Sequence, residues 1–200
     1  MCLFIETMCV EQGRIINLDY HLERIKSTRK RFWNTENMVS VDDLSALAAT
    51  QNDRAKLRFT YDKENIYDLS CTPYSIRKIE KLKLLINNDI EYAYKSIDRS
   101  ALNLLKGQVK PSEEIVIVQQ NHLTDTSYTN IALFDGELWI TPSTPLLNGT
   151  RRKQLLNAGK IIEREVLVTD LNSFQSISLI NAMIDLEELV LPISSIDNLL

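Results

Sequence analysis

Several residue types that often mark a function are scarce in this chain of 200 residues, which has two histidines, three cysteines and five glycines. His21 and His122 are not spaced with a nucleophile or with a third metal ligand, so we expect neither a Ser-His-Asp triad nor a zinc site. Cys2, Cys9 and Cys71 also lack metal-ligand spacing. Each lies in an apolar, strand-like context, and we expect core thiols rather than a metal centre.

Glycine-rich phosphate loops are missing too, because the chain has no GxGxxG and no GxxxxGK[ST] motif. Nor is there an excess of positive charge: 23 Lys and Arg against 27 Asp and Glu give a net charge of −4. Domains that bind nucleic acid usually carry a basic surplus, so we expect no such partner. The basic residues within 26–31 are expected on a solvated helix face.

Long hydrophobic runs are also lacking, since no stretch approaches the roughly 18 apolar residues that a membrane span needs. The first residues, "MCLFIETMCVEQG", have no basic segment and are interrupted by Glu6, so they do not resemble a signal peptide. We therefore expect a cytoplasmic protein without membrane contact.

The residues that are present indicate a fold in two parts. In the first half, helices are predicted from Asp19 and from Ser40, which has Asp43 three residues later as in a loose capping box. Strand formers predict strands at 2–10, 15–18, 55–61, 66–76 and 81–86. In the second half, helices are predicted at 98–107, 150–159 and near 169–174, and strands at 113–120, 129–134, 137–142, 161–168, 176–184 and 189–193.

The first half is therefore an α+β unit and the second a strand-rich α/β unit. The composition changes between Asn87 and Tyr94, and we predict domains at 1–90 and 91–200.

A carboxylate occupies an unusual place in residues 122–134, "HLTDTSYTNIALF". Asp125 stands where the apolar pattern predicts entry into a buried sheet, with "EIVIVQQ" before it and "ALFDGELWITP" after it. Burying an acid is costly unless a cation meets it. The sequence therefore predicts a cationic partner for Asp125.

Lys95 is a candidate nucleophile. It is flanked by Tyr92, Tyr94 and Ile97, and loss of water around its amine would lower its pKa and let it attack carbonyls. The alternative is a linker lysine with its amine in water. A second candidate feature is "LLNGTRRKQLL", a helix start whose N-terminus would bind phosphate, or would be a plain helix start.

Together these features match the needs of one cofactor. Pyridoxal phosphate requires a Schiff-base lysine, a carboxylate for its pyridinium nitrogen and donors for its phosphate. Lys95, Asp125, the helix N-terminus and Arg58, inside the predicted strand "KLRFTY", would supply these groups.

Five segments, in order, resemble the class IV aminotransferases, the fold type IV pyridoxal-phosphate enzymes that include branched-chain and D-amino-acid aminotransferases and 4-amino-4-deoxychorismate lyase. They are "FIETMCVEQGRIINLDYHLERIKST", "KLRFTY", "YKSIDR", "LTDTSYTNIALF" and "WITPSTPLLNGTRRKQLL". The "YKSIDR" segment is similar to the lyase form of the lysine motif. The resemblance implies a two-domain, D-amino-acid aminotransferase-like fold, with the Schiff-base lysine in the C-terminal domain, and a homodimer.

The resemblance also implies roles for single residues. Lys95 would form the internal aldimine and move the substrate proton, Asp125 would pair with the pyridinium nitrogen, and Arg58 would hold the phosphate. The further cofactor-binding positions are Asn130, Gly149, Thr150, Arg151, Asn181 and Ala182. Candidates for the substrate carboxylate are Arg99, Tyr128 and Arg77.

Two departures accompany the resemblance: the family usually has Glu where this chain has Asp125, and the chain is shorter than typical members. Amino transfer between an amino acid and a 2-oxo acid is the expected reaction. The alternatives are β-elimination of the lyase type, towards which Arg99 four residues after Lys95 points, and a pyridoxal-phosphate-binding protein without turnover.

Overall fold

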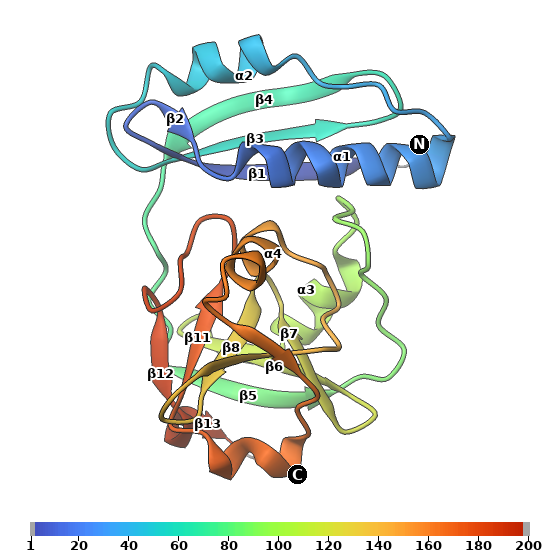
Figure 1. The fold of residues 1–200 in the computed structure, drawn as a ribbon. Coiled ribbons are helices and arrows are strands. Elements are labelled where there is room, and N and C mark those ends of the chain that lie inside the picture. The colour runs from blue at the N-terminus through green and yellow to red at the C-terminus, as the bar shows by residue number, and fades with distance from the viewer. Residues whose placement is uncertain (1–2, 198–200) are drawn as a thin grey trace. The chain divides into compact units, whose positions relative to one another are not determined.

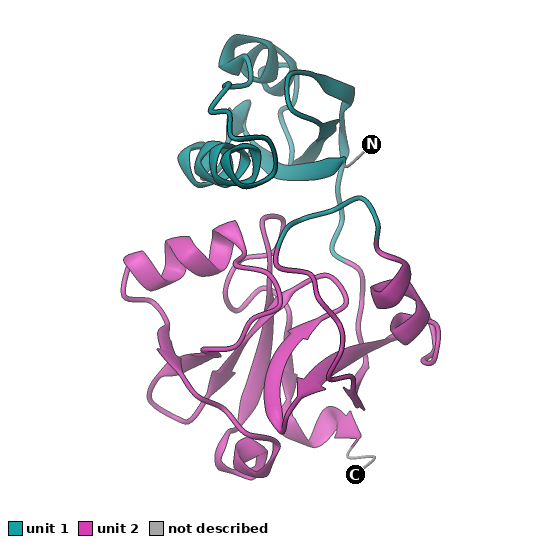
Figure 2. Cartoon of the chain, turned by 90° about the vertical axis from the view of Figure 1, so that its right-hand side faces the viewer, with its two compact units in different colours: residues 1–76, 94–98 teal, residues 77–93, 99–200 magenta. Residues whose placement is uncertain are grey.

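The structure, a computed structural model, describes residues 3–197, and its elements are shown in Figure 1. Two compact units are present (Figure 2). Unit 1 contains the chain up to Ile76 together with Tyr94–Asp98, and unit 2 contains Arg77–Ala93 and the chain from Arg99 onward. Cys2 lies outside the described residues, whereas Cys9 is buried and Cys71 is half-buried.

Unit 1 is built on an antiparallel sheet in the order β2-β1-β3-β4. Its strands are β1 (Phe4–Glu11), β2 (Arg14–Ile15), β3 (Ala55–Tyr61) and β4 (Ile66–Pro73). The helices are α1 (Leu18–Trp33) and α2 (Val41–Ala48), and the Ser40 side chain accepts the Asp43 N–H at the start of α2. The predicted cap is therefore present.

Alternation along β3 sets the core of unit 1. Ala55, Leu57, Phe59 and Tyr61 are buried with Phe4, Met8 and Val10 of β1 and with apolar residues of both helices. Arg58 lies between these positions and is exposed. Because successive strand side chains point to opposite faces, Arg58 lies on the face away from this core.

Unit 2 contains two sheets. One, in the order β10-β9-β8-β11-β12, is formed by β8 (Asn130–Phe134), β9 (Trp139–Pro142), β10 (Ile162–Arg164), β11 (Ser176–Ile180) and β12 (Val190–Pro192). The other, in the order β13-β5-β6-β7, is formed by β5 (Lys81–Ile86), β6 (Glu113–Gln119), β7 (His122–Thr126) and β13 (Ile196–Asp197). Helices α3 (Ser100–Lys106) and α4 (Thr150–Asn157) and the 3-10 turns η1 (Val168–Ser173) and η2 (Ile193–Ser195) complete the unit.

One apolar cluster joins the two sheets of unit 2, with side chains from β5, β6 and β7 packed against others from β8, β9 and β11. Two smaller clusters cover the outer faces. Ile115 and Ile117 of β6 pack with Leu102 and Leu105 of α3, and Ala132 of β8 packs with residues of α4. Strand β6 is therefore apolar on both faces, which explains its unbroken "IVIV" run.

The predicted fold class, a mixed α/β fold, is confirmed. The units, however, divide differently from the predicted 1–90 and 91–200. Strand β5 pairs in parallel with β6 and so belongs to unit 2. Residues 94–98 belong to unit 1, because Phe4 bridges Ser96 and the Ile5 N–H donates to the Lys95 carbonyl at 2.9 Å. Lys95 therefore lies in unit 1, not in the C-terminal part.

Strand β7 is a further difference, because the sequence predicts no strand between those at 113–120 and 129–134. Asp125 lies inside β7 and not at the start of β8. None of the helices over residues 3–197 has the length and apolarity needed to cross a membrane.

Candidate active site

Asp125 is a buried carboxylate, 5% exposed, held by two uncharged donors. Its Oδ1 accepts from Asn130 Nδ2 at 2.8 Å and its Oδ2 accepts from the Leu147 N–H at 2.9 Å. Burial raises the pKa of Asp125 to about 6, although these two hydrogen bonds and the more distant charge of Arg152 act to lower it. No ion pair to Asp125 occurs within the described residues.

Asn130 joins the start of β8 to the loop before α4. Besides Asp125, its Nδ2 contacts the Leu147 carbonyl at 2.8 Å. Gly149 is pressed against the same amide, because a Cβ on this glycine would lie 2.0 Å from Asn130 Oδ1. The side chain of Asn130 therefore fixes Asp125 and the loop 147–149 together, and only glycine fits at position 149.

The N-terminus of α4 follows this glycine directly. Thr150 and Arg151 are its first two residues and both are buried. The first N–H groups of an α-helix point out of its end with partial positive charge, which favours anions. Arg151 Nη1 donates to Asp185 at 3.1 Å, whereas its buried Nε makes no hydrogen bond in the described structure.

The loop that joins β7 to β8 is held from several sides. Thr126 Oγ1 accepts the N–H groups of Tyr128 and Thr129 at 3.2 and 2.9 Å. Asn181 Nδ2 donates to the Tyr128 carbonyl at 3.3 Å, and Arg99 Nη2 donates to the Ser127 carbonyl at 2.7 Å. The conformation of the chain just after Asp125 is therefore fixed by its own Thr126 side chain and by side chains from two other segments.

Asn181 and Ala182 form the tight turn that follows β11. Asn181 Oδ1 accepts the Met183 N–H at 2.8 Å, and the main chains of Asn181 and Ile184 bridge. Through its bond to Tyr128, this turn is connected to the loop after Asp125. Seven of the predicted site residues (Asp125, Asn130, Gly149, Thr150, Arg151, Asn181 and Ala182) thus lie on connected elements of unit 2.

The substrate candidates separate into two groups. Arg99, besides its bond to Ser127, lies over the Tyr92 ring at 5.6 Å and is occupied in holding the loop. Arg77 and Tyr128 instead contact each other, with the guanidinium 5.0 Å from the centre of the Tyr128 ring.

In unit 1, Lys95 and Arg58 lie on opposite sides of β1. The Lys95 carbonyl accepts the Ile5 N–H, and Arg58 of β3 pairs with Thr7, two residues further along β1. The strand therefore brings both predicted cofactor residues of this unit to its first half.

A buried ionic cluster in unit 1 was not predicted. Glu6, fully buried in β1, accepts from Arg24 Nη2 and Nε at 2.6 and 2.8 Å and contacts His21 Nδ1 at 2.7 Å. Burial would raise the pKa of Glu6, but Arg24 and His21 hold it at about 2. Burial lowers the pKa of His21, and the charge of Lys95 lowers it further, so the cluster lies near Lys95.

The sequence contained a signal for this cluster. Glu6 interrupts an apolar strand as Asp125 does, and "HLER" places His21 and Arg24 three residues apart, on one face of a helix. Because a buried acid needs a cation, Glu6 and these two basic residues are natural partners.

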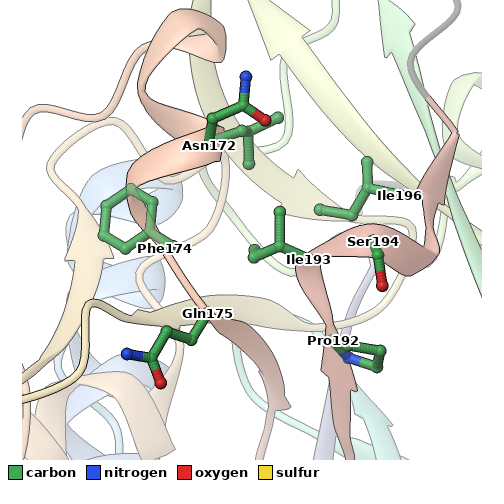
Figure 3. Close-up of a pocket in the computed structure, with 8 residues that line it drawn as sticks. Asn172, Phe174, Gln175, Pro192, Ile193, Ser194 and Ile196 are labelled. Atoms are coloured by element: carbon green, nitrogen blue, oxygen red, sulfur yellow. The ribbon is translucent and has the colours of Figure 1, made fainter.

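A pocket of about 380 Å³ lies at the other end of unit 2 (Figure 3). Its lining comes from η1, the residues before β11, β12, η2 and β13, and includes Phe174, Gln175, Pro192 and Ile193. None of the predicted site residues lines it. The pocket is therefore separate from the candidate active site.

The residues of unit 2 fit pyridoxal phosphate at two points. Asp125 is a buried carboxylate whose contacts in the described structure are all to uncharged groups, and a protonated ring nitrogen would supply the missing charge. Gly149 admits close approach at the N-terminus of α4, as a phosphate requires.

Comparisons with known proteins identify the family of the chain. The family described as amino-transferase class IV matches residues 3–196. An uncharacterised protein of Haemophilus influenzae is 34% identical over 89% of this chain and 96% of its own length. A provisionally assigned aminodeoxychorismate lyase of Schizosaccharomyces pombe is 27% identical over 76% of this chain and 72% of its own length.

Among solved structures, a provisionally assigned 4-amino-4-deoxychorismate lyase from Haemophilus somnus superposes with a TM-score of 0.84 and 32% identity. The match covers 93% of this chain and 98% of that one. A solved structure of the same fold, a hypothetical aminotransferase from Mycobacterium tuberculosis with a TM-score of 0.75 and 16% identity, is described as a form bound to pyridoxal phosphate. The chain belongs to the class IV aminotransferase family, and its cofactor is pyridoxal phosphate.

Proposed function

We propose that this enzyme binds pyridoxal phosphate through Lys95 of unit 1 and Asp125 of unit 2. When bound, the cofactor accepts the electrons released at the substrate α-carbon. The Lys95 amine attaches the cofactor and then moves protons of the substrate at its Nζ atom. The Asp125 carboxylate, held by Asn130 and the Leu147 N–H, keeps the ring nitrogen protonated.

The phosphate is proposed to lie at the N-terminus of α4, close to Gly149, Thr150 and Arg151, with Arg58 as a further cation. The position of Arg58 beside β1, which also carries the bond to Lys95, supports this role. The turn at Asn181 and Ala182 is proposed as a second phosphate contact, supported by its connection to the loop after Asp125.

We propose that the reaction is an elimination of the lyase type. The observation that carries this choice is the match at 32% identity, over nearly the full length of both chains, to a protein assigned as a 4-amino-4-deoxychorismate lyase. A provisionally assigned amino-acid aminotransferase from Mesorhizobium loti is 18% identical and supports the fold alone. Arg99, part of the lyase-like "YKSIDR" segment, holds the loop after Asp125, which agrees with this choice.

The experiment is a comparison of two assays on the protein saturated with pyridoxal phosphate. With 4-amino-4-deoxychorismate as the only substrate, elimination releases pyruvate, which a coupled lactate dehydrogenase assay detects. The expected result is pyruvate release in the wild type and none in Lys95→Ala. Pyruvate formation at the same rate in both proteins would contradict the proposal.

Amino transfer is the second candidate, because the family model that matches residues 3–196 is described as amino-transferase class IV. It needs both an amino donor and a 2-oxo acid, whereas elimination needs one substrate. A panel of amino acids with 2-oxoglutarate distinguishes the two: formation of glutamate without any pyruvate release from the lyase substrate would assign the protein to the aminotransferases.

We also propose a homodimer, as the family resemblance implies. Sedimentation equilibrium is expected to give twice the chain mass of 23.0 kDa. A single species at the mass of one chain at micromolar concentration would contradict it.

A further inference from the structure

Glu114 of β6 is a fully buried carboxylate with a half-exposed cation as its partner. Its Oε2 accepts from Arg77 Nη2 at 2.5 Å, and its Oε1 accepts the Ile115 N–H at 3.0 Å and the Ser127 N–H at 3.4 Å. A buried carboxylate with several donors is itself fixed in position. Glu114 therefore fixes the guanidinium of Arg77 beside the loop that follows Asp125.

Tyr128 lies beneath this guanidinium. The Arg77 Cζ atom is 5.0 Å from the centre of the Tyr128 ring. The Tyr128 hydroxyl is buried and makes no hydrogen bond of normal geometry within the described residues, although the Arg77 guanidinium lies within weak hydrogen-bonding reach. Burial raises the pKa of this phenol, and the charge of Arg77 acts to lower it, so hydroxyl and guanidinium lie close together.

The main chain of Tyr128 is fixed on both sides. Its N–H donates to Thr126 Oγ1 at 3.2 Å, and its carbonyl accepts from Asn181 Nδ2 at 3.3 Å. A buried hydroxyl without a partner costs free energy, and native structures rarely keep one without a reason. Thr126 and Asn181 hold the main chain of Tyr128 in place, so the hydroxyl cannot move to a partner elsewhere. A partner of normal geometry for the hydroxyl must therefore be a bound ligand.

We propose that the Tyr128 hydroxyl and the Arg77 guanidinium together bind a carboxylate of the substrate. A phenol O–H and a guanidinium N–H are both donors, and a guanidinium has five N–H groups, of which Glu114 takes one. The exposed side of Arg77, 45% of its side chain, leaves a path for the ligand. The assignment rests on the proposed function, because it names the group that recognises the substrate.

Arg99 does not share this role. Its guanidinium donates to the Ser127 carbonyl and lies over Tyr92, and so it holds the main chain of the loop. Of the three candidate residues, two form the binding pair and the third is a positioning residue.

The test measures binding and not turnover. Isothermal titration calorimetry on protein saturated with pyridoxal phosphate compares 4-aminobenzoate and 2-oxoglutarate, carboxylates related to the two reactions, with uncharged 4-aminobenzamide. In Tyr128→Phe and Arg77→Gln the affinity for a carboxylate is expected to fall roughly tenfold or more, as for a lost hydrogen bond to a charged group. The affinity for the amide is expected to change less than twofold.

Two matched variants control for substitution itself. Tyr67→Phe removes an exposed phenol that bonds Asp62, and Lys78→Gln removes the neighbouring exposed cation, which pairs with Glu80. Both are expected to bind the carboxylates as the wild type does. Unchanged carboxylate affinity in Tyr128→Phe would overturn the proposal, and so would a wild type that binds neither carboxylate.

Measurement of cofactor binding distinguishes the role of Tyr128 in substrate binding from the proposed function of the enzyme. The dissociation constant for pyridoxal phosphate is expected to stay within twofold in Tyr128→Phe, and a parallel loss of cofactor would overturn the substrate role. For a substrate that the wild type converts, the KM of Tyr128→Phe is expected to rise at least tenfold, while its kcat changes less than threefold. The carboxylate titrations do not depend on turnover, so they test the binding pair even if the protein has no lyase activity. Failure of the lyase proposal and failure of the binding proposal are therefore distinguishable.

Discussion

The carboxyl group of Asp125 is buried, and its surroundings disfavour the ionised form. Burial raises its pKa from 3.8 to about 6, because two uncharged hydrogen-bond donors do not replace the water it has lost. A folded-state pKa above the unfolded value means that the folded protein keeps a proton which the unfolded chain releases. The free energy of unfolding therefore falls as the pH rises between about 4 and about 6.

At the residue scale, Asp125→Asn is expected to remove this dependence. Above pH 6 the ionised carboxylate costs the cofactor-free wild type on the order of 3 kcal/mol, because each tenfold change in a protonation equilibrium corresponds to about 1.4 kcal/mol. Urea denaturation of both cofactor-free proteins from pH 4 to pH 7.5 measures this cost. Two curves with the same pH slope would show that Asp125 does not titrate as described.

The acid at position 125 could be predicted from the sequence because an apolar pattern surrounds it. The hydrogen-bond donors to Asp125 could not be predicted in this way. Asn130 and Leu147 belong to another strand and to a loop, and no local pattern indicates their contacts with Asp125. Glu6 had the same signal, a carboxylate inside an apolar strand, and its partners His21 and Arg24 lie one helix away. Glu6, like Asp125, is therefore a position where the sequence indicates a buried acid that needs a cation.

At the scale of elements, the loop before α4 requires a residue without a side chain, Gly149. A methyl group at position 149 would lie 2.0 Å from Asn130 Oδ1, and the amide also holds Asp125 and the Leu147 carbonyl. Neither the strand nor the helix can move away without breaking these bonds. A substitution at position 149 is therefore expected to disturb both the loop before α4 and the Asp125 carboxylate.

Gly149→Ala is expected to lower the free energy of unfolding by about 2–3 kcal/mol through overpacking, and to weaken pyridoxal phosphate binding by about tenfold or more. Gly107→Ala is the control, because its Cβ would come no closer than 3.3 Å to a neighbouring atom. Urea denaturation and cofactor titration of both variants give the comparison. Equal effects of the two substitutions would exclude the contact with Asn130 as the cause.

The strands and helices with clear apolar alternation, such as β3 at Ala55–Tyr61, were predicted from sequence to the residue. Strand β7 was not, because its hydroxyl-rich sequence does not resemble a buried strand. Thr124 shows why it can be one: its Oγ1 donates to the Ile117 carbonyl at 2.7 Å, so the polar atom is satisfied inside the sheet. Local sequence does not indicate such a partner.

At the scale of the whole molecule, the two units are not consecutive in sequence. Residues 94–98 return to unit 1 after the chain has already formed β5 of unit 2. This return depends on pairing between Ser96 and Phe4, which are far apart in sequence, and so composition alone placed the boundary at 90. Lys95 was predicted as a nucleophile in a domain of residues 91–200, whereas the compact units group it with unit 1.

A cofactor held by Lys95 and Asp125 is expected to protect both units. Hydrogen exchange of the Ile5 N–H, bonded to the Lys95 carbonyl, and of the Leu147 N–H, bonded to Asp125, is expected to slow about tenfold with saturating pyridoxal phosphate. In Lys95→Ala the protection in unit 1 should be lost. Protection confined to one unit in the wild type would contradict the shared site.

The most direct measurement is borohydride reduction of the protein saturated with pyridoxal phosphate, followed by peptide mass spectrometry. We expect one phosphopyridoxyl group per chain, on Lys95, and a markedly lower yield at limiting cofactor in Asp125→Asn. Labelling of another lysine, or no labelling at saturation, would contradict it.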